Sequence, residues 1–148
     1  MDKVKLEKMF TEYEKAFSTL DIRKNAEFFA DTFISAGPKG TIAQSKEDFI
    51  KKAGQAAEFY KSVGQTSAKI ISKNFIPISD HYTMATVHWG VMFQKTGDEL
   101  VEFDVSYFVQ ETGGDPKIIL FIAHQDEEAA MKELGLNAPA ETIRSTNN

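Results

Sequence analysis

Three long apolar runs within residues 82–125 constrain the fold more than any other feature of the chain. The runs read YTMATVHWGVMFQK, ELVEFDVSYFVQE and KIILFIAHQ, and they are separated by the turn sequences TGD and TGGDP. Long runs that are rich in Val, Ile, Tyr, Phe and Trp and bounded by glycine turns predict strands joined as hairpins. We therefore expect these three strands to form the spine of one antiparallel sheet.

Both faces of this sheet are predicted to be buried. Successive side chains of a strand point to opposite faces, so residues of one parity share a face. A sheet with one face in water would carry polar residues at most positions of that face. We expect helices to cover one face and a second subunit, in a homodimer, to cover the outer face. The first parity contains Val87, Trp89, Val91, Phe93, Val101, Phe103, Val105, Tyr107 and Val109, and the other contains Met84, Met92, Leu100, Phe108, Ile118, Leu120 and Ile122.

The rest of the chain alternates between helical and short strand patterns. Apolar residues at spacings of three and four predict a first helix from Leu6 to Leu20, and Asp21 is a typical N-cap for a short second helix over 22–30. Ser45 and Asp48 have the spacing of a capping box at the start of a third helix. The pattern is completed by strands at 31–35, 41–43 and 67–76, a third helix ending near Val63, a last helix over Glu127–Leu134 and a frayed tail over 137–148.

This order of elements predicts one α+β domain over residues 1–136, with helices packed on one face of an antiparallel sheet. The net charge of −5 argues against nucleic acid, which attracts basic surfaces. No apolar stretch is long enough for a membrane span, and the charged N-terminus does not resemble a secretory signal. The chain has no Cys, so a thiolate nucleophile and a disulfide framework are excluded. We expect a cytoplasmic protein.

Four short motifs occur in an order that resembles a known superfamily. They are Tyr13-x-x-x-Phe17-x-x-x-Asp21, Phe28-Phe29-Ala30-Asp31, Ser45-Lys-Glu-Asp-Phe49 and Gly114-x-x-Lys117-Ile118-Ile119. Their order and spacing, over residues 6–134, are similar to those of the nuclear-transport-factor-2-like superfamily, which includes ketosteroid isomerase and the SnoaL-like polyketide cyclases. The resemblance implies a cystatin-like cone, in which a curved antiparallel sheet and its helices enclose a deep pocket.

The resemblance also implies which side chains line the cone. Most of them are aromatic or aliphatic, the usual composition of a site for a flat or apolar small molecule. Tyr13 would be the polar group inside the cone, Trp89 and Tyr107 its aromatic walls, and Gln125 a hydrogen-bonding group near its mouth. The predicted wall consists of Tyr13, Phe17, Phe33, Phe49, Phe59, Tyr60, Val87, Trp89, Val91, Val105, Tyr107, Phe121, Ala123 and Gln125.

The sequence leaves open whether the protein is an enzyme. Ketosteroid isomerase needs an aspartate base, a tyrosine and a protonated aspartic acid. By resemblance Tyr13 matches the tyrosine, but the base position falls near Gly37 and the acid position near Val105. That isomerase chemistry is therefore not expected, and no cofactor is predicted. The simpler interpretation of Tyr13 is a core residue whose hydroxyl bonds a main-chain carbonyl.

Three polar residues are predicted to lie on neighbouring strands of the outer face. Asp104 should be opposite His124, with His88 as a diagonal neighbour. Two histidines and one carboxylate are the ligands of a facial-triad iron site. The alternative interpretation is a polar patch in the dimer interface with His–Asp hydrogen bonding. We therefore predict that no metal binds unless these three residues converge.

Two functions remain open from the sequence. The first is a cone-fold protein that binds a small apolar or aromatic compound, as a binder or as a lyase, isomerase or cyclase. The second is a non-catalytic dimeric interaction module whose cone is filled by its own aromatic rings. A filled cone predicts a loss of several kcal/mol of stability on Trp89→Ala, whereas an open cone predicts a smaller loss.

Overall fold

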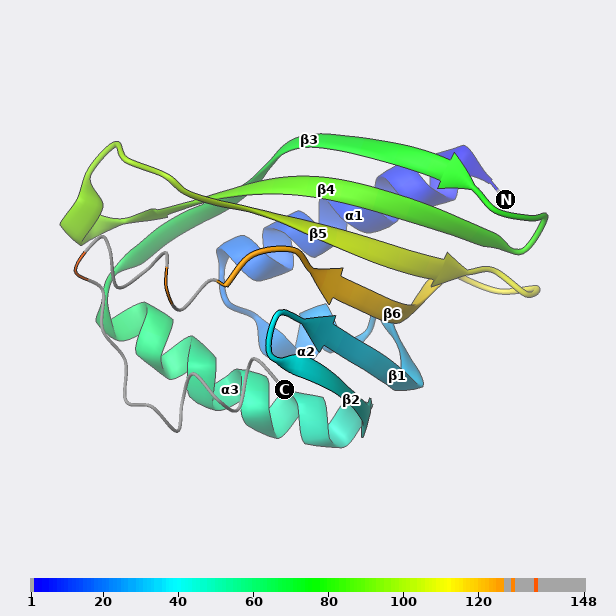
Figure 1. Cartoon of the computed structure of the whole chain (residues 1–148), viewed down its shortest axis with the longest axis horizontal. Helices are drawn as coiled ribbons and strands as arrows, with labels where there is room; N and C mark the ends of the chain where they lie inside the picture. Colours follow the sequence, from blue (N-terminus) through cyan, green and yellow to red (C-terminus); the bar gives the residue numbers. More distant parts are fainter. Residues whose placement is uncertain (1, 127–128, 130–134, 136–148) are drawn as a thin grey trace.

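The computed structural model describes residues 2–126, Ala129 and Gly135 of the chain (Figure 1). The predicted tail and all of the predicted last helix except Ala129 lie outside this range. The described elements are α1 (Lys3–Ser18), α2 (Ile22–Ala26), β1 (Phe29–Gly37), β2 (Gly40–Ser45), α3 (Lys46–Ser62), β3 (Gln65–Pro77), β4 (Tyr82–Phe93), a 3₁₀ turn (Gln94–Thr96), β5 (Val101–Gln110) and β6 (Lys117–Ala123).

The six strands form one sheet in the order β2-β1-β6-β5-β4-β3. The three long strands predicted from residues 82–125 are its centre, and their antiparallel pairing is confirmed. The expectation of a purely antiparallel sheet is wrong at one position, because β1 pairs with β6 in parallel. The sheet is therefore mixed. Parallel neighbours need a long connection, and β2, α3, β3, β4 and β5 all lie between these two strands in the chain.

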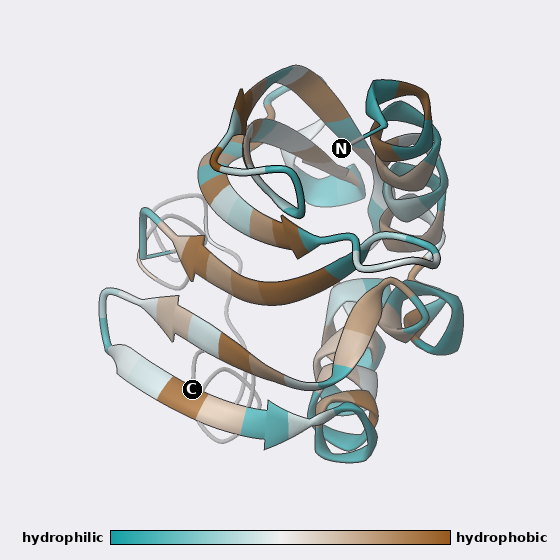
Figure 2. Ribbon diagram, turned by 90° about the vertical axis from the view of Figure 1, so that its right-hand side faces the viewer, coloured by the Kyte–Doolittle hydropathy of each residue, from teal (hydrophilic) through white to brown (hydrophobic). Residues whose placement is uncertain are grey.

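The helices cover one face of a strongly curved sheet, as Figure 2 shows. Asp2 is the N-cap of helix α1, and its carboxylate accepts a hydrogen bond from the Val4 N–H at 2.9 Å. Ser45 caps α3 as predicted, since its hydroxyl accepts from the Asp48 N–H at 3.1 Å. Helix α2 is shorter than the predicted 22–30, because the chain is already extended in β1 from Phe29 onward.

The edge strand β3 is tied to α1 by two side chains. The Ser18 hydroxyl accepts a hydrogen bond from the Ala68 N–H at 3.1 Å, and a Glu14 carboxylate oxygen accepts one from the Ile70 N–H at 2.6 Å. A strand at the edge of a sheet leaves main-chain groups without a partner strand. Here α1 supplies acceptors for two of those groups.

The inner face of the sheet, against the helices, holds the core. The first parity predicted from the sequence is confirmed, because Val87, Trp89 and Val109 have no exposed surface. The prediction that Ile118 lies on the outer face is wrong, since this residue is fully buried opposite Val109. The register shifts between Phe108 and Val109, and such an irregularity moves the following side chains to the other face.

The outer face carries a continuous line of apolar side chains across all six strands, which we call the outer apolar row. Each member is the register partner of the next, from one edge of the sheet to the other. Both ends, Ile76 and Ala43, are exposed, and the exposed fractions are 42% for Ile76 and 39% for Ile34 beside Ala43. In order from β3 to β2 the row contains Ile76, Met84, Phe108, Leu120, Ile34 and Ala43.

Candidate functional site

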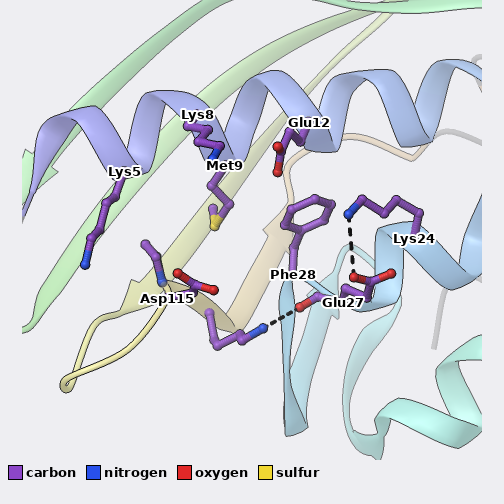
Figure 3. Close-up of a pocket in the computed structure, with 10 residues that line it drawn as sticks. Lys5, Lys8, Met9, Glu12, Lys24, Glu27, Phe28 and Asp115 are labelled. Atoms are coloured by element: carbon purple, nitrogen blue, oxygen red, sulfur yellow. Dashed lines mark hydrogen bonds and ion pairs between the residues drawn. The ribbon is translucent and has the colours of Figure 1, made fainter.

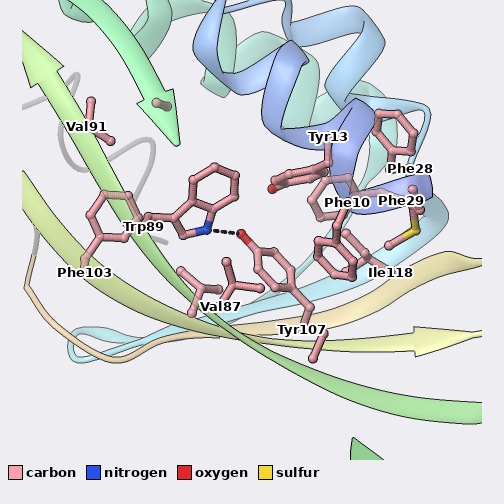
Figure 4. Packing of buried hydrophobic residues seen from close by; sticks show 14 of the residues in the cluster. Phe10, Tyr13, Phe28, Phe29, Val87, Trp89, Val91, Phe103, Tyr107 and Ile118 are labelled. Carbon is pink, nitrogen blue, oxygen red and sulfur yellow. Dashed lines mark hydrogen bonds between the residues drawn. The ribbon is translucent and has the colours of Figure 1, made fainter. Parts of the chain in front are cut away.

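Aromatic rings pack the space between α1 and the centre of the sheet (Figure 4). Trp89 is fully buried, and its indole N–H donates a hydrogen bond to the Tyr107 hydroxyl at 3.1 Å. The Tyr13 ring lies 5.5 Å from the Tyr107 ring and 5.9 Å from the Trp89 ring, measured between centroids. These three residues, predicted as polar group and walls of an open cone, therefore contact one another directly.

A small pocket lies beside this ring cluster, and all of its lining residues come from α1, α2, α3 and the turn between α1 and α2. We call it the helix pocket. Its volume is about 140 Å³. The Phe17 ring separates the pocket from Trp89, at a centroid distance of 4.9 Å. The lining residues are Tyr13, Phe17, Leu20, Ile22, Asn25, Phe49, Ala53, Ala56, Ala57 and Tyr60.

The predicted wall residues divide into two groups. Tyr13, Phe17, Phe49 and Tyr60 line the helix pocket. Most of the others are buried in the core instead, and Phe121 is partly buried against it. Their side chains fill space because the curved sheet brings its inner face close to α1. The second group contains Phe33, Phe59, Val87, Trp89, Val91, Val105 and Tyr107 as core residues.

Gln125 was predicted at the mouth of the cone, and this is wrong. Its amide group bonds Asp104 twice, accepting from the Asp104 N–H at 2.6 Å and donating to the carboxylate at 2.9 Å. Strand β6 ends at Ala123, so strand parity no longer determines the direction of the Gln125 side chain. Gln125 therefore belongs to the outer face.

Sequence reasoning missed six residues of the helix pocket. Ala53 lies one turn from Phe49 on α3, and the same spacing continues to Ala56 and Ala57, so helical periodicity could have found these three. Asn25 could not be found in this way, because α2 has only five residues and gives no periodic signal. Leu20 lies in the turn between α1 and α2, and Ile22 is the first residue of α2.

The turn between α1 and α2 is conformationally unusual. Leu20 has a φ of 56°, in the left-handed region, where a residue with a bulky side chain is uncommon. The Asp21 carboxylate then accepts a hydrogen bond from the Lys24 N–H at 3.1 Å and starts α2. Together the turn and the cap fix how α2 faces the pocket.

The outer face holds a polar group that we call the outer polar cluster: His88, Glu102, Asp104 and Gln125. Nε2 of His88 lies 2.8 Å from a Glu102 carboxylate oxygen, and Nδ1 lies 2.7 Å from one of Asp104. Hydrogen bonds to Glu102 and Asp104 raise the pKa of His88 above its usual value of 6.5. Hydrogen bonds from His88 and Gln125 lower the pKa of Asp104.

The predicted metal triad does not converge. His88 and His124 both neighbour Asp104 across the strands, and His88 is directly opposite it rather than diagonal. Both His88 nitrogens are already bonded to carboxylates, and Nε2 of His124 lies 2.7 Å from the Ser106 hydroxyl. Within the described residues no group of three or more His, Asp or Glu is arranged to hold a metal. The predicted His–Asp hydrogen bonding is present between His88 and Asp104, and the dimer interface around it stays a prediction.

A second cleft, of about 310 Å³, lies between α1, α2 and the β5–β6 turn (Figure 3). Met9 and Phe28 are among its apolar lining residues, with charged side chains of both signs around them. Lys24 pairs with Glu27 at 3.5 Å, and Lys117 donates to the Glu27 carbonyl at 2.7 Å. Most of the lining residues are charged, so this cleft is a weaker candidate than the helix pocket for an apolar molecule.

The sequence of the chain matches the family model described as NTF2-like protein (DUF6841) over residues 2–126. This match covers most of the 148 residues. The chain belongs to this NTF2-like family. The resemblance to the nuclear-transport-factor-2-like superfamily predicted from the four motifs is thereby confirmed. A search of the curated proteins found no match. No helix in the described part of this NTF2-like chain is long and apolar enough to cross a membrane.

Solved structures of bacterial NTF2-like proteins share the fold. A protein of unknown function from Shewanella oneidensis aligns with a TM-score of 0.71 at 10% identity, over 84% of this chain and all of that one. A cystatin-like NTF2-like protein from Novosphingobium aromaticivorans gives 0.71 at 12% identity, over 90% and 88%. Another protein from that organism, provisionally named an aromatic ring hydroxylase, gives 0.65 at 11% identity, over 83% and 87%. At these identities the likeness shows the α+β cystatin-like fold alone.

Proposed function

We propose that this NTF2-like chain binds a small apolar molecule, about the size of one aromatic ring, in the helix pocket. The observation that carries this proposal is the pocket itself. Its volume of about 140 Å³ is close to that of an engineered apolar cavity of about 150 Å³ that binds benzene. Ligand sites in proteins are typically lined by aromatic and aliphatic side chains with few polar groups, and nine of the ten lining residues are of these types.

Binding is favoured over turnover by the chemistry of the lining. The ten residues include no Asp, Glu, His or Lys, the side chains that most often transfer protons in enzymes. A lyase, isomerase or cyclase would have to rely on the phenols of Tyr13 and Tyr60. One structural neighbour is provisionally named an aromatic ring hydroxylase, which keeps aromatic compounds among the candidate ligands.

Titration with fluorobenzene, followed by ¹⁹F NMR, tests this proposal. We expect saturable binding to the wild-type protein with a Kd below about 1 mM, which corresponds to about −4 kcal/mol. Ala53→Leu puts three additional carbon atoms into the pocket and should weaken binding about tenfold or more. Gln55→Leu makes a similar change on the exposed side of the same helix and is the matched control. Absence of saturable binding to the wild type, or equal binding to Ala53→Leu, would contradict the proposal.

The alternative function is a dimeric interaction module, and two observations favour it. The ring cluster of Tyr13, Trp89 and Tyr107 occupies much of the interior that a larger ligand would need. The outer apolar row offers a surface for a second copy of the chain. Apolar patches on a soluble protein often mark such interfaces, and a two-fold dimer brings the same patch of both subunits together.

Light scattering coupled to gel filtration tests the proposed dimer. We expect the wild-type mass to be twice the 16.6 kDa of one chain. Phe108→Glu places a charge in the middle of the outer apolar row and should give the monomer mass, because a buried unpaired charge is strongly unfavourable. Thr112→Glu, in the exposed β5–β6 turn, is the control and should remain dimeric. A monomeric wild type would rule out the dimer whatever the result with fluorobenzene.

A further inference from the structure

Asn25 brings an unpaired amide group to the helix pocket. Only 6% of the residue is exposed, although it lines the pocket. Its main chain is satisfied, since its N–H donates to the Asp21 carbonyl at 2.9 Å and its carbonyl accepts from the Phe28 N–H at 3.2 Å. Within the described residues its side-chain amide has no hydrogen-bond partner. Neither amide atom is among the fully enclosed side-chain atoms that lack a partner in the described part of the chain, so the amide keeps accessible surface from which it can bond a molecule in the pocket.

The buried amide of Gln44 provides a comparison. Its nitrogen donates to the Ser35 hydroxyl at 2.6 Å, and its oxygen is buried without a partner among the described residues. Gln44 lies on β2 and is not among the residues that line the helix pocket. Its amide is therefore half satisfied by a neighbouring strand, whereas neither end of the Asn25 amide is paired with a described residue and the amide is next to a cavity.

The chain holds Asn25 in place by strained and capped local structure. Leu20 adopts its left-handed conformation one residue before Asp21, which caps α2. Conformations of this kind are strained and are concentrated at functional sites. Leu20 itself lines the pocket, so the strained residue and the unpaired amide lie at the same site.

We propose that Asn25 selects the ligand of the helix pocket, and that the ligand is a neutral single-ring compound with one hydrogen-bonding group, such as a phenol. This inference rests on the binding function proposed above and adds the chemical class of the ligand. A carboxamide offers both a carbonyl acceptor and an N–H donor, so it can bond a hydroxyl in either sense. A ligand hydroxyl would satisfy the Asn25 amide, and the ring would contact the apolar wall.

The wall also argues that the ligand is uncharged. None of the ten lining residues carries a formal charge at neutral pH, so a carboxylate on the ring would enter the pocket without a counter-ion. Moving an ionised carboxylate out of water is far more costly than moving a hydroxyl that finds a partner. A phenol is therefore expected to bind and a benzoate is not.

Three fluorinated probes separate these possibilities at neutral pH: fluorobenzene, 4-fluorophenol and 4-fluorobenzoate, each titrated by ¹⁹F NMR. We expect the wild type to bind 4-fluorophenol roughly 2- to 12-fold more tightly than fluorobenzene, the effect of one net hydrogen bond. The benzoate should bind about tenfold or more weakly than the phenol. Asn25→Leu and Asn25→Ala should bind the phenol and fluorobenzene equally. Asn74→Leu, an exposed asparagine of β3, is the control and should keep the preference.

Failure of this inference differs from failure of the binding function. If fluorobenzene does not bind the wild type, the binding function itself is wrong. If fluorobenzene binds but the phenol gains nothing, or if Asn25→Leu keeps the preference for the phenol, the role of Asn25 is wrong and the binding function stands. Fluorobenzene binding by Asn25→Leu also shows that this variant still forms the pocket.

The stability of the unliganded variant gives a second readout. The Asn25 amide makes no hydrogen bond to the described residues, so Asn25→Leu should leave the urea midpoint of unfolding unchanged or raise it. A structural asparagine would give the opposite result, because its replacement would break hydrogen bonds within the protein. A lower midpoint for Asn25→Leu, together with loss of fluorobenzene binding, would overturn the proposal.

Discussion

Both faces of the sheet carry apolar residues, but these residues are arranged differently. On the inner face the side chains interlock as rings, with Trp89 fully buried and bonded to Tyr107. On the outer face they lie in one row across six strands, with both ends exposed and His88 bound by carboxylates nearby. The inner face is built for packing within one chain.

This difference teaches that alternation of apolar residues alone does not define a core. Inner residues are covered by helices of the same chain, so their removal leaves a cavity. Outer residues are flanked by polar groups such as His88 and Asp104, whose side chains stay about one third exposed in a single chain. Substitutions matched between the faces should therefore separate stability of the fold from other roles.

The largest expected difference is between Trp89→Ala and Met84→Ala. Trp89→Ala should lower the free energy of unfolding by about 3–5 kcal/mol, because it leaves a large cavity in the ring cluster. Met84→Ala, in the outer apolar row of the same strand, should cost about 1 kcal/mol or less in a single chain. Urea denaturation measured at low protein concentration gives both values. Equal losses would show that the outer face is as tightly packed as the inner one.

A smaller difference is expected between two tyrosine hydroxyls. Tyr107→Phe leaves the buried indole N–H of Trp89 without its acceptor and should cost about 1–3 kcal/mol. Tyr82→Phe, on the outer face, removes the acceptor of a hydrogen bond from the half-buried Gln110. It should lower the free energy of unfolding by no more than about 0.5 kcal/mol. Thermal or urea unfolding compares the two variants. A neutral Tyr107→Phe would mean that this bond does not stabilise the ring cluster.

The smallest effect is expected in the outer polar cluster, and it depends on pH. The raised pKa of His88 contributes stability to the fold. This contribution is fully present below about pH 6.5 and is lost as the pH rises through the higher pKa of the folded state. The lowered pKa of Asp104 also contributes stability. This contribution is fully present above pH 3.8, the usual pKa of the group, and is lost as the pH falls through the lower pKa of the folded state. Both contributions are present between about pH 4 and 6.5.

His88→Gln should therefore destabilise the protein more at about pH 5.5 than at about pH 8.5. Because His88 is about one third exposed, the loss should stay below about 1 kcal/mol. Urea denaturation at the two pH values measures it. His81→Gln controls for the loss of an imidazole, since His81 bonds a main-chain carbonyl rather than a carboxylate. A loss that is larger at the higher pH would contradict the assignment.

The sequence predicted the strands and the capped helices well, because their signals are local. Alternation of apolar residues identified β4 and β5, and the Ser45 hydroxyl marks the start of α3. The register irregularity after Phe108 and the end of β6 at Ala123 carry no local signal, so Ile118 and Gln125 were assigned to the wrong faces. The parallel pairing of β1 with β6 depends on contacts between segments far apart in the chain.

The candidate site was predicted in part for the same reason. The resemblance to the superfamily placed the aromatic residues of α1 and α3 in the wall of the cone, but it could not distinguish rings that line a cavity from rings that fill it. Trp89 and Tyr107 fill the space, whereas Phe17 and Tyr60 line it. Asn25 lies in a five-residue helix, and its significance depends on a side chain that has no hydrogen-bond partner among residues 2–126.

The side chains of α1 that bond the edge of β3 have a consequence for aggregation. Unsatisfied main-chain groups of an edge strand can recruit a strand from another molecule, and repeated recruitment leads to fibres. Ser18 and Glu14 occupy the N–H groups of Ala68 and Ile70, so this part of the edge cannot act as a template. A chain with both acceptors removed would expose this segment to strand exchange, with fibre formation as its failure mode.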